Sequence, residues 1–228
     1  MAVMDEFKEE REAVKHGPIK KRIAWFFDYN KWKILAIVLA AVCVGTFIYQ
    51  QVTKRNTVLY VAMVNFAADP AAEEDVQGRF ESTYLENPKK ERIVLDSDIN
   101  IALNVEGVRD GLKYRPEDEE KLGALSVSGG LDLMITGEDV FRKYATQGYF
   151  VPLTDVYGED LSDLPGGLSK EELLTIDGEA AAIPVDSAEL LKKYYYYTGA
   201  EGQKLYLGFV YGGAHPEYAK EFADFLFQ

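Results

Sequence analysis

The pattern of apolar and polar positions sets one long apolar segment apart from the rest of the chain. No residue between Lys33 and Lys54 is charged. An uninterrupted apolar run of roughly 18–20 residues is long enough to cross about 30 Å of hydrocarbon as a helix. Trp32 and Tyr49 lie near its ends, where membrane interfaces favour aromatic rings with a polar edge. The pattern therefore predicts a single transmembrane helix over 32–52.

After this segment the pattern changes to alternating strands and helices. A continuous apolar run over 58–64 predicts a strand buried on both faces, and 92–101 and 131–136 are two further strands. Helices between them are expected to begin at Pro70 and Pro116. Strands that alternate with helices pair in parallel through right-handed crossovers. We therefore expect an α/β domain with a three-layer, mostly parallel sheet.

The last third of the chain predicts a hairpin, two helices and one strand. The dipeptide Asp177-Gly178 is a hairpin turn signal between two short apolar runs. The expected elements are a hairpin over 173–185, a helix from Asp186 or Ser187 to the tyrosines before Gly199, a strand over 205–210 and a helix from Pro216.

Basic residues flank the apolar segment unequally, which predicts its orientation. Residues 1–33 contain eight Lys or Arg, whereas only Lys54 and Arg55 follow the segment closely. Positive residues favour the cytoplasmic side of a membrane. We therefore expect four parts, at the plasma membrane with the N-terminus in the cytoplasm: a cytoplasmic basic and aromatic arm over 1–31, the transmembrane helix over 32–52, a linker over 53–56, and an extracytoplasmic domain over 57–228.

A cleaved secretory signal is the alternative to a permanent anchor. Such signals have a shorter apolar core of about 7–15 residues followed by a small-x-small cleavage site. Here Gln-Gln-Val-Thr follows Tyr49, and the apolar run continues past Cys43, the residue that a lipoprotein would modify. We therefore favour the uncleaved anchor.

Two features of the membrane region leave their alternatives open. The arm over 19–29 places three basic residues before a dense aromatic group, so it could lie on the inner leaflet or only fix the topology. Small residues four apart, Ala36 with Ala40 and Ala41 with Gly45, would allow two spans to approach closely. This spacing is common in membrane helices, so it supports a homodimer only weakly.

Charge limits the partners of the outer domain. Residues 56–228 contain 15 basic and 32 acidic residues, a net charge of −17. Nucleic acid and anionic lipid both require a positive surface facing them. We therefore expect no nucleic-acid partner, and a lipid contact only through the span. The single cysteine, Cys43, lies in the span, so the outer domain must be held by its core rather than by a disulfide.

The expected ligand site lies where the strands end, because open α/β sheets bind ligands at the carboxyl ends of their strands. Thr136 and Ser187 precede expected helices, whose free N–H groups could accept a small anion or carboxylate. The alternative is that these residues are ordinary helix caps. The candidate ligand-binding residues are Asn65, Phe66, Thr136, Gly137, Glu138, Asp186 and Ser187.

A second candidate surface is the run of four tyrosines from Tyr194 to Tyr197. Four consecutive residues point all round a helix, so some of these rings should face outward. Exposed tyrosine favours contact with protein or glycan. We therefore interpret Tyr194, Tyr195, Tyr196 and Tyr197 as an interaction surface; the alternative is that they are half core and half rim.

Catalytic and metal-binding patterns have little support. Asp96 and Asp98 lie on one strand face and could join a cation site, but such pairs also occur on solvated faces. His16 belongs to the arm and His215 begins the last helix, so neither has a second histidine or a thiol nearby in sequence. We expect no catalytic residue, no metal and no cofactor, and hence a protein that is not an enzyme.

Three segments resemble extracellular solute-binding proteins of bacterial ABC importers, which have a type 2 periplasmic-binding-like fold. Residues 131–155, LDLMITGEDVFRKYATQGYFVPLTD, are similar to the family's strand and helix that lead into a Gly-hydrophobic-hydrophobic-x-Leu-x-Asp segment. Residues 176–185, IDGEAAAIPV, resemble its Asp-Gly…Ile-Pro hairpin, and residues 212–226 resemble its closing helix. The resemblance implies an extracytoplasmic binding domain of bacterial origin.

The chain departs from this family in size. Where the family inserts a second lobe after the Ile-Pro strand, only residues 186–210 are present. The family grips its solute between two lobes that close on a hinge, so the resemblance implies a reduced, one-lobe form. We therefore expect a binding or interaction module with a protein partner, for which a membrane protein is one candidate. The alternative is a receptor for a small solute that uses a partner chain or a homodimer as its second lobe.

Overall fold

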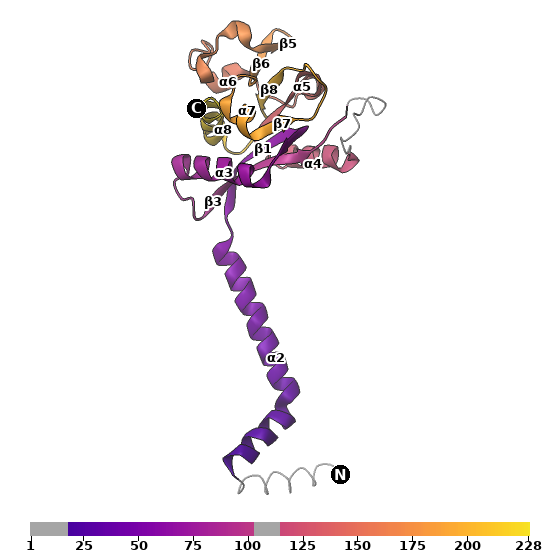
Figure 1. Cartoon of the computed structure of the whole chain (residues 1–228), viewed down its shortest axis with the longest axis vertical. Helices are drawn as coiled ribbons and strands as arrows, with labels where there is room; N and C mark the ends of the chain where they lie inside the picture. Colours follow the sequence, from indigo (N-terminus) through magenta and orange to yellow (C-terminus); the bar gives the residue numbers. More distant parts are fainter. Residues whose placement is uncertain (1–17, 103–114) are drawn as a thin grey trace. The chain divides into compact units, whose positions relative to one another are not determined.

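The computed structural model describes residues 18–102 and 115–228 (Figure 1). The chain separates into two compact units, residues 1–54 and residues 55–228. Residues 1–17 of the expected cytoplasmic arm lie outside the described residues, and so do the side chains of its aromatic residues Trp25 and Phe26.

The described part of the first unit consists of one long helix, α2 (Ile19–Thr53). Within it, the 22 residues Asn30–Gln51 have a mean hydropathy of 2.1, and none of this stretch is buried. Large apolar side chains such as Leu39 and Phe47 are exposed along it. A helix of this length and composition is sufficient to cross a membrane.

The second unit is built on a six-stranded sheet with the strand order β3-β1-β4-β8-β6-β5. Strand β1 pairs in parallel with both β3 and β4, whereas β8 lies antiparallel to β4 and to β6, and β5 lies antiparallel to β6. Four strands therefore run in one direction and two in the other. The strands are β1 (Asn56–Val64), β3 (Glu91–Ile99), β4 (Leu133–Gly137), β5 (Leu174–Ile176), β6 (Glu179–Pro184) and β8 (Leu205–Phe209).

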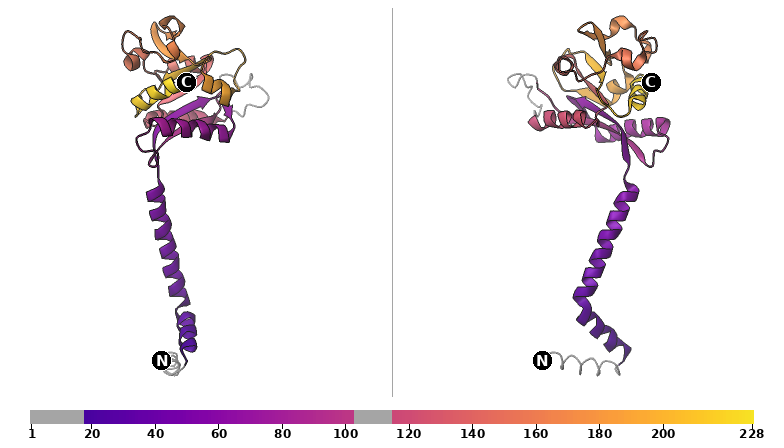
Figure 2. Two further views of the ribbon diagram at one scale, coloured as in Figure 1. Left: turned by 60° about the vertical axis from the view of Figure 1, so that its left-hand side comes forward. Right: turned by 180° about the vertical axis from the view of Figure 1, so that it is seen from behind.

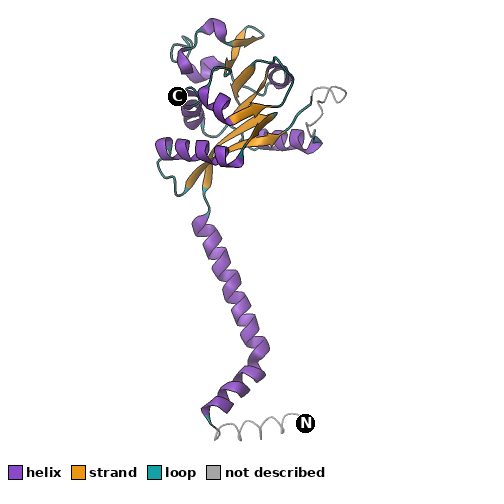
Figure 3. Ribbon diagram, in the orientation of Figure 1, coloured by secondary structure: helices purple, strands orange, loops and turns teal. Residues whose placement is uncertain are grey.

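A separate two-stranded ribbon pairs β2 (Phe66–Ala68) with β7 (Tyr195–Tyr197). Six α-helices accompany the sheet within the described part of this unit, and Figure 3 distinguishes them from the strands. They are α3 (Pro70–Tyr84), α4 (Pro116–Val127), α5 (Glu138–Ala145), α6 (Leu153–Tyr157), α7 (Glu189–Tyr194) and α8 (Pro216–Phe225); two short 3-10 turns span Pro165–Gly167 and Lys170–Glu172.

Helices cover both faces of the sheet, as the views in Figure 2 show. Alternate residues of β1 enter two different cores: Leu59 and Met63 pack with residues of α3 and α8, and Val64 packs with residues of α4 and α5. Because successive side chains of a strand point to opposite faces, these two cores lie on opposite sides of β1. The expected three-layer, mostly parallel α/β sheet is therefore confirmed.

Several predicted element boundaries are also confirmed. The carboxylate of Asp69 caps α3, with its Oδ1 2.9 Å from the Ala71 nitrogen, and Pro70 is the first helical residue. The expected hairpin turn joins β5 to β6, and both Asp177 and Gly178 have positive φ.

The predicted helix starts before Glu138 and before Glu189 are wrong in detail. Helix α5 follows Gly137 and α7 follows Ala188, and neither has a side-chain cap. Instead of capping α7, Asp186 accepts a hydrogen bond at its Oδ1 from the nitrogen of Leu205, 3.1 Å away. The side chain of Asp186 therefore bonds the first residue of β8 rather than the first turn of α7.

The four tyrosines do not continue a helix. Helix α7 ends at Tyr194, and Tyr195–Tyr197 form β7 against Phe66–Ala68. The backbone hydrogen bonds of this pairing replace those of another helical turn, and aromatic residues favour the extended conformation. The partner strand lies more than a hundred residues away in sequence, so local pattern did not reveal it.

A pair of glycine substitutions tests the packing at the end of β4. A Cβ at Gly137 would overlap the phenol of Tyr197, whereas a Cβ at Gly78 in the middle of α3 would meet nothing. We expect Gly137→Ala to lower the free energy of unfolding by about 1–3 kcal/mol, and Gly78→Ala to raise it by about 0.5–1 kcal/mol. Urea unfolding of the two variants beside the wild type measures both changes. Equal stability of the two variants would contradict this packing.

Candidate functional site

The carboxyl ends of β1, β3 and β4 lie along one edge of the sheet, because these strands are parallel. At this edge the chain brings the end of β1 together with the segment after β7. The carbonyl oxygen of Asn65 accepts hydrogen bonds from both the nitrogen and the hydroxyl of Thr198, at 2.8 and 2.9 Å. The rings of Phe66 and Tyr197 contact edge to face, with their centroids 5.2 Å apart.

The predicted site residues are spread along this edge rather than gathered in one cavity. Gly137 lies opposite Leu205 in the sheet, and Leu205 is bonded to Asp186, which follows β6. Ser187 is exposed beside it. Asn65 and Phe66 lie at the other end, next to β3. Their roles as ligand-binding residues stay predictions.

The side chain of Asn65 forms an internal clamp. It is 4% exposed, and its amide bonds both backbone groups of Ile101: Oδ1 lies 2.8 Å from the Ile101 nitrogen and Nδ2 lies 2.9 Å from its oxygen. Asn65 has a φ of 61°, a left-handed conformation that asparagine tolerates better than most residues. Its amide therefore holds the chain after β3 in place and is not free for a ligand.

The first N–H groups of α5, where an anion was expected, already have acceptors. The nitrogen of Glu138 donates to the oxygen of Lys204 at 3.0 Å, and the nitrogen of Asp139 donates to Oε1 of Gln203 at 3.2 Å. Thr136 is fully buried just before the helix, and its hydroxyl has no hydrogen-bond partner among the described residues. Acceptors from Gln203 and Lys204 therefore already bond the N–H groups that an anion would need.

A hollow of about 490 Å³ opens beside β3 at the same edge. Of the candidate ligand-binding residues, it contains only Phe66. Its polar groups come from the first turn of α3, the end of β3, the start of α4 and Thr198 after β7. Its lining includes Phe66, Ala68, Pro70, Glu73, Ser97, Asp98, Asn100, Arg115 and Thr198. A signal for this site was present in the sequence: Glu73 is in the first turn of the helix that follows β1, a usual position for ligand contacts in α/β folds.

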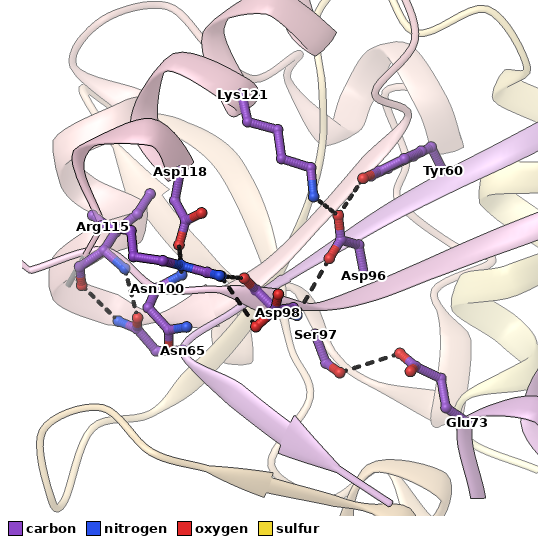
Figure 4. Close-up of polar contacts among 11 residues, drawn as sticks. Tyr60, Asn65, Glu73, Asp96, Ser97, Asp98, Asn100, Arg115, Asp118 and Lys121 are labelled. Atoms are coloured by element: carbon purple, nitrogen blue, oxygen red, sulfur yellow. Dashed lines mark hydrogen bonds and ion pairs between the residues drawn. The ribbon is translucent and has the colours of Figure 1, made fainter. Parts of the chain in front are cut away.

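Polar side chains next to the hollow are joined in a network along β3 (Figure 4). Asp96 accepts from Nζ of Lys121 at 2.5 Å and also from the hydroxyl of Tyr60. Asp98 pairs with Arg115, with 3.0 Å between Oδ1 and the guanidinium. Each of the two aspartates proposed for a cation site therefore already has a basic partner. The described residues contain no group of three His, Cys, Asp or Glu side chains suited to a metal ion.

Burial shifts two acidic groups of this network. Burial raises the pKa of the Tyr60 phenol far above its usual range, and its hydrogen bond to Asp96 adds to this shift. Burial also raises the pKa of Glu73, partly offset by the hydrogen bond from Ser97 and increased again by the charge of Asp96. Tyr60 is therefore a hydrogen-bond donor at neutral pH, and Glu73 ionises less readily than an exposed glutamate.

Charged side chains also cover the free edge of β3. Nε of Arg55 donates to the oxygen of Glu91 at 3.0 Å, and Oε1 of Glu81 accepts from the nitrogen of Ile93 at 3.0 Å. At the other end, Asp118 accepts from the nitrogen of Asn100 at 2.8 Å. Covered backbone groups disfavour the addition of another strand. A partner that binds here must therefore contact side chains rather than extend the sheet.

The four tyrosines of the expected interaction surface have different environments. Tyr195 is buried, and Tyr197 fills the space above Gly137, where burial raises its pKa to about 12. Tyr194 is half-buried below Lys193. Tyr196 is 70% exposed. Of the four rings, only that of Tyr196 is fully available to a partner.

Comparisons with known proteins were made at three levels. No protein-family model matches this chain. No curated protein matches it either. Among solved structures, it is similar to an ABC substrate-binding protein of Listeria monocytogenes in complex with cycloalternan, with 20% identity and a TM-score of 0.35 over 57% of this chain and 29% of the other.

Two further similar structures belong to the same broad class. An N-glycan transport solute-binding protein of Streptococcus pneumoniae shares 14% identity over 57% of this chain and 25% of its own, with a TM-score of 0.34. The substrate-binding domain of a putative molybdenum ABC transporter of Clostridium difficile shares 10% identity over 76% of this chain and 93% of its own, with a TM-score of 0.31. This chain therefore spans less than a third of the first two proteins.

Substitutions at Asn65 separate its side-chain clamp from its backbone conformation. Asn65→Gly keeps a residue that accepts positive φ but removes both hydrogen bonds to Ile101, so we expect a loss of about 2 kcal/mol in the free energy of unfolding. Asn65→Ala adds left-handed strain, so the loss should be about 1 kcal/mol larger. Urea unfolding followed by circular dichroism measures both. A glycine variant as stable as the wild type would show that the clamp contributes nothing.

Proposed function

We propose that this protein is a single-pass membrane protein whose C-terminal α/β domain lies outside the cytoplasm and acts as a binding or interaction module. The observation that carries this proposal is the stretch Asn30–Gln51, an apolar helical segment of 22 residues in which no residue is buried. Water is a poor solvent for such a surface, and lipid is a good one. The basic residues that precede it favour a cytoplasmic N-terminus.

The junction after the helix supports an uncleaved anchor. Helix α2 continues to Thr53, and β1 begins at Asn56. Between them, Arg55 is already fixed to its domain: its guanidinium pairs with Glu81 at 2.5 Å and donates to the oxygen of Pro88 at 2.7 Å. Only Lys54 and Arg55 lie between the helix and β1, and Arg55 is held by the folded domain, so little free chain is left there for cleavage.

A binding role rather than catalysis is favoured by the polar groups that the structure describes. His215 lies with Nδ1 3.7 Å from Oδ1 of Asp132, and the nitrogen of His215 donates to the same carboxylate. Within the described ranges, no hydroxyl is hydrogen-bonded to this imidazole. A nucleophile and a base within reach of each other are the first requirement of acyl transfer, so we propose a non-catalytic function with a protein as the main partner.

A second candidate function is a receptor for a small solute. The hollow at the carboxyl ends of β1 and β3 favours it, because it combines charged, amide and hydroxyl groups with an apolar wall. It is open to solvent and built from one lobe only. A receptor of this kind would take its second wall from a partner chain or from a second copy of this protein.

Single-cysteine labelling tests the proposed topology. Cys43 is replaced by alanine, and a cysteine is introduced either at Ala2 or at the exposed Ser82 of α3. In intact cells we expect a membrane-impermeant maleimide to label Ser82→Cys, and to label Ala2→Cys only after permeabilisation, with both proteins at full length on a gel. The reverse labelling would overturn the orientation, and a shortened product would indicate a cleaved signal.

Photocrosslinking tests the protein partner. A photoreactive amino acid replaces Tyr196 in one variant and Tyr211 in a control, since these side chains are 70% and 69% exposed but lie on different elements. We expect ultraviolet light on intact cells to give one discrete adduct from position 196 and none from position 211. Adducts of equal yield at both positions, or at neither, would contradict an interaction surface at β7.

A further inference from the structure

We propose that the hollow at the carboxyl ends of β1 and β3 binds a small organic cation of the primary-amine class, with Glu73 as the group that receives the ammonium. This inference deepens the second candidate function, the receptor for a small solute, and rests on it. It rests on which charged side chains of the hollow already have ion-pair partners and which do not.

The positive group of the hollow is already neutralised. The guanidinium of Arg115 lies 3.0 Å from Oδ1 of Asp98 and 3.1 Å from Oδ2 of Asp118, and it also donates to the backbone oxygen of Asp98. Two carboxylates thus share one cation. An anionic ligand would have to displace a carboxylate to reach it, so Arg115 is a poor anion receptor.

The backbone N–H groups at the start of α3 are also occupied. Oδ1 of Asp69 accepts from the nitrogen of Ala71 at 2.9 Å, and the oxygen of Asp69 accepts from the nitrogens of Ala72 and Glu73 at 2.9 and 3.0 Å. Free N–H groups are what make a helix start an anion site. This helix start therefore offers nothing to a phosphate or a carboxylate.

Glu73 is the carboxylate of the hollow that no cation pairs with among the described residues. Its Oε1 accepts one hydrogen bond, from the hydroxyl of Ser97 at 3.2 Å. Asp96, whose charge acts on Glu73, already has Lys121 as its basic partner. A partly buried carboxylate that is hydrogen-bonded only by the neutral residue Ser97 can still accept further hydrogen bonds, and those from an ammonium group are the strongest.

A second polar atom near Glu73 also lacks a partner. The hydroxyl of Tyr195 is buried without a hydrogen bond to any described residue. Burial raises the pKa of this phenol, and the charge of Glu73 raises it further, which shows that the two groups lie close. The phenol can both donate and accept a hydrogen bond, so this buried hydroxyl is a second group whose hydrogen-bonding capacity the described residues leave unused.

The apolar part of the lining suits the hydrocarbon part of an amine. Phe66, Ala68 and Pro70 line the hollow together with its polar groups. The volume, about 490 Å³, admits a small molecule. The net charge of −17 on residues 56–228 also draws cations toward the domain from solution. A short alkylamine combines the required charge, size and apolar surface.

Calorimetry with a pair of isosteric probes tests the inference. Full-length protein in nanodiscs of zwitterionic phosphatidylcholine is titrated with n-butylammonium chloride and with 1-butanol. We expect saturable binding of butylammonium, at least about tenfold tighter than that of butanol, because the charge-assisted hydrogen bond to Glu73 is made only by the amine. Glu73→Gln should weaken butylammonium binding by about tenfold or more. Glu74→Gln, an exposed neighbour on the same helix, should change it by less than about twofold.

Three results would overturn the inference: no saturable binding of butylammonium, equal binding by Glu73→Gln and the wild type, or tighter binding of butyrate than of butylammonium. Unchanged thermal unfolding of Glu73→Gln confirms that a loss of binding is local, and glutamine keeps the hydrogen bond to Ser97. None of these results affects cysteine labelling or the adduct at position 196. The amine site and the membrane-anchored binding role therefore fail independently.

Discussion

Burial of β1 on both faces is the constraint on which the α/β domain depends. Leu59 and Met63 need a layer of helices on one side, and Val64 needs another layer on the other side. A strand with an unbroken apolar run such as residues 58–64 is disfavoured at an edge or on a solvated face. The chain therefore places β3 and β4 on either side of β1 and sends α3 and α4 to opposite faces.

The connection to α2 and the candidate site lie at the two ends of β1. At its amino end, Arg55 is bound to the helix–strand turn of the same domain, so almost no free chain remains after α2. At its carboxyl end, Asn65 turns the chain in a left-handed conformation and clamps the segment after β3. The hollow beside Glu73 forms where these two segments leave the sheet. The chain from α2 therefore enters β1 at one end, and the candidate site lies at the other end of the same strand.

The sequence predicted those elements whose conformation depends mainly on residues that are close together in the chain. The apolar run of β1, the Asp69-Pro70 start of α3 and the Asp177-Gly178 hairpin each depend on residues within a few positions. Contacts between distant segments were beyond such signals. Tyr195–Tyr197 form a strand because they pair with Phe66–Ala68. The side chain of Gln203 accepts a hydrogen bond from the nitrogen of Asp139, where we had expected free N–H groups at the start of α5. The position of Glu73 in the first turn of α3 is visible in the sequence, but its contact with Ser97 is not, because Ser97 belongs to another element.

Hydrogen exchange of the full-length protein in lipid nanodiscs, read by mass spectrometry, tests this organisation most directly, because it reports local stability along the whole chain. A membrane-crossing α2 joined to a domain built around β1 predicts slow exchange over 30–51 in lipid. Within the domain it predicts the slowest exchange in β1 and β4, and faster exchange in the edge strands β3 and β5. Rapid exchange over 30–51 in lipid would contradict the membrane span. Exchange in β1 as fast as in β5 would contradict its central role.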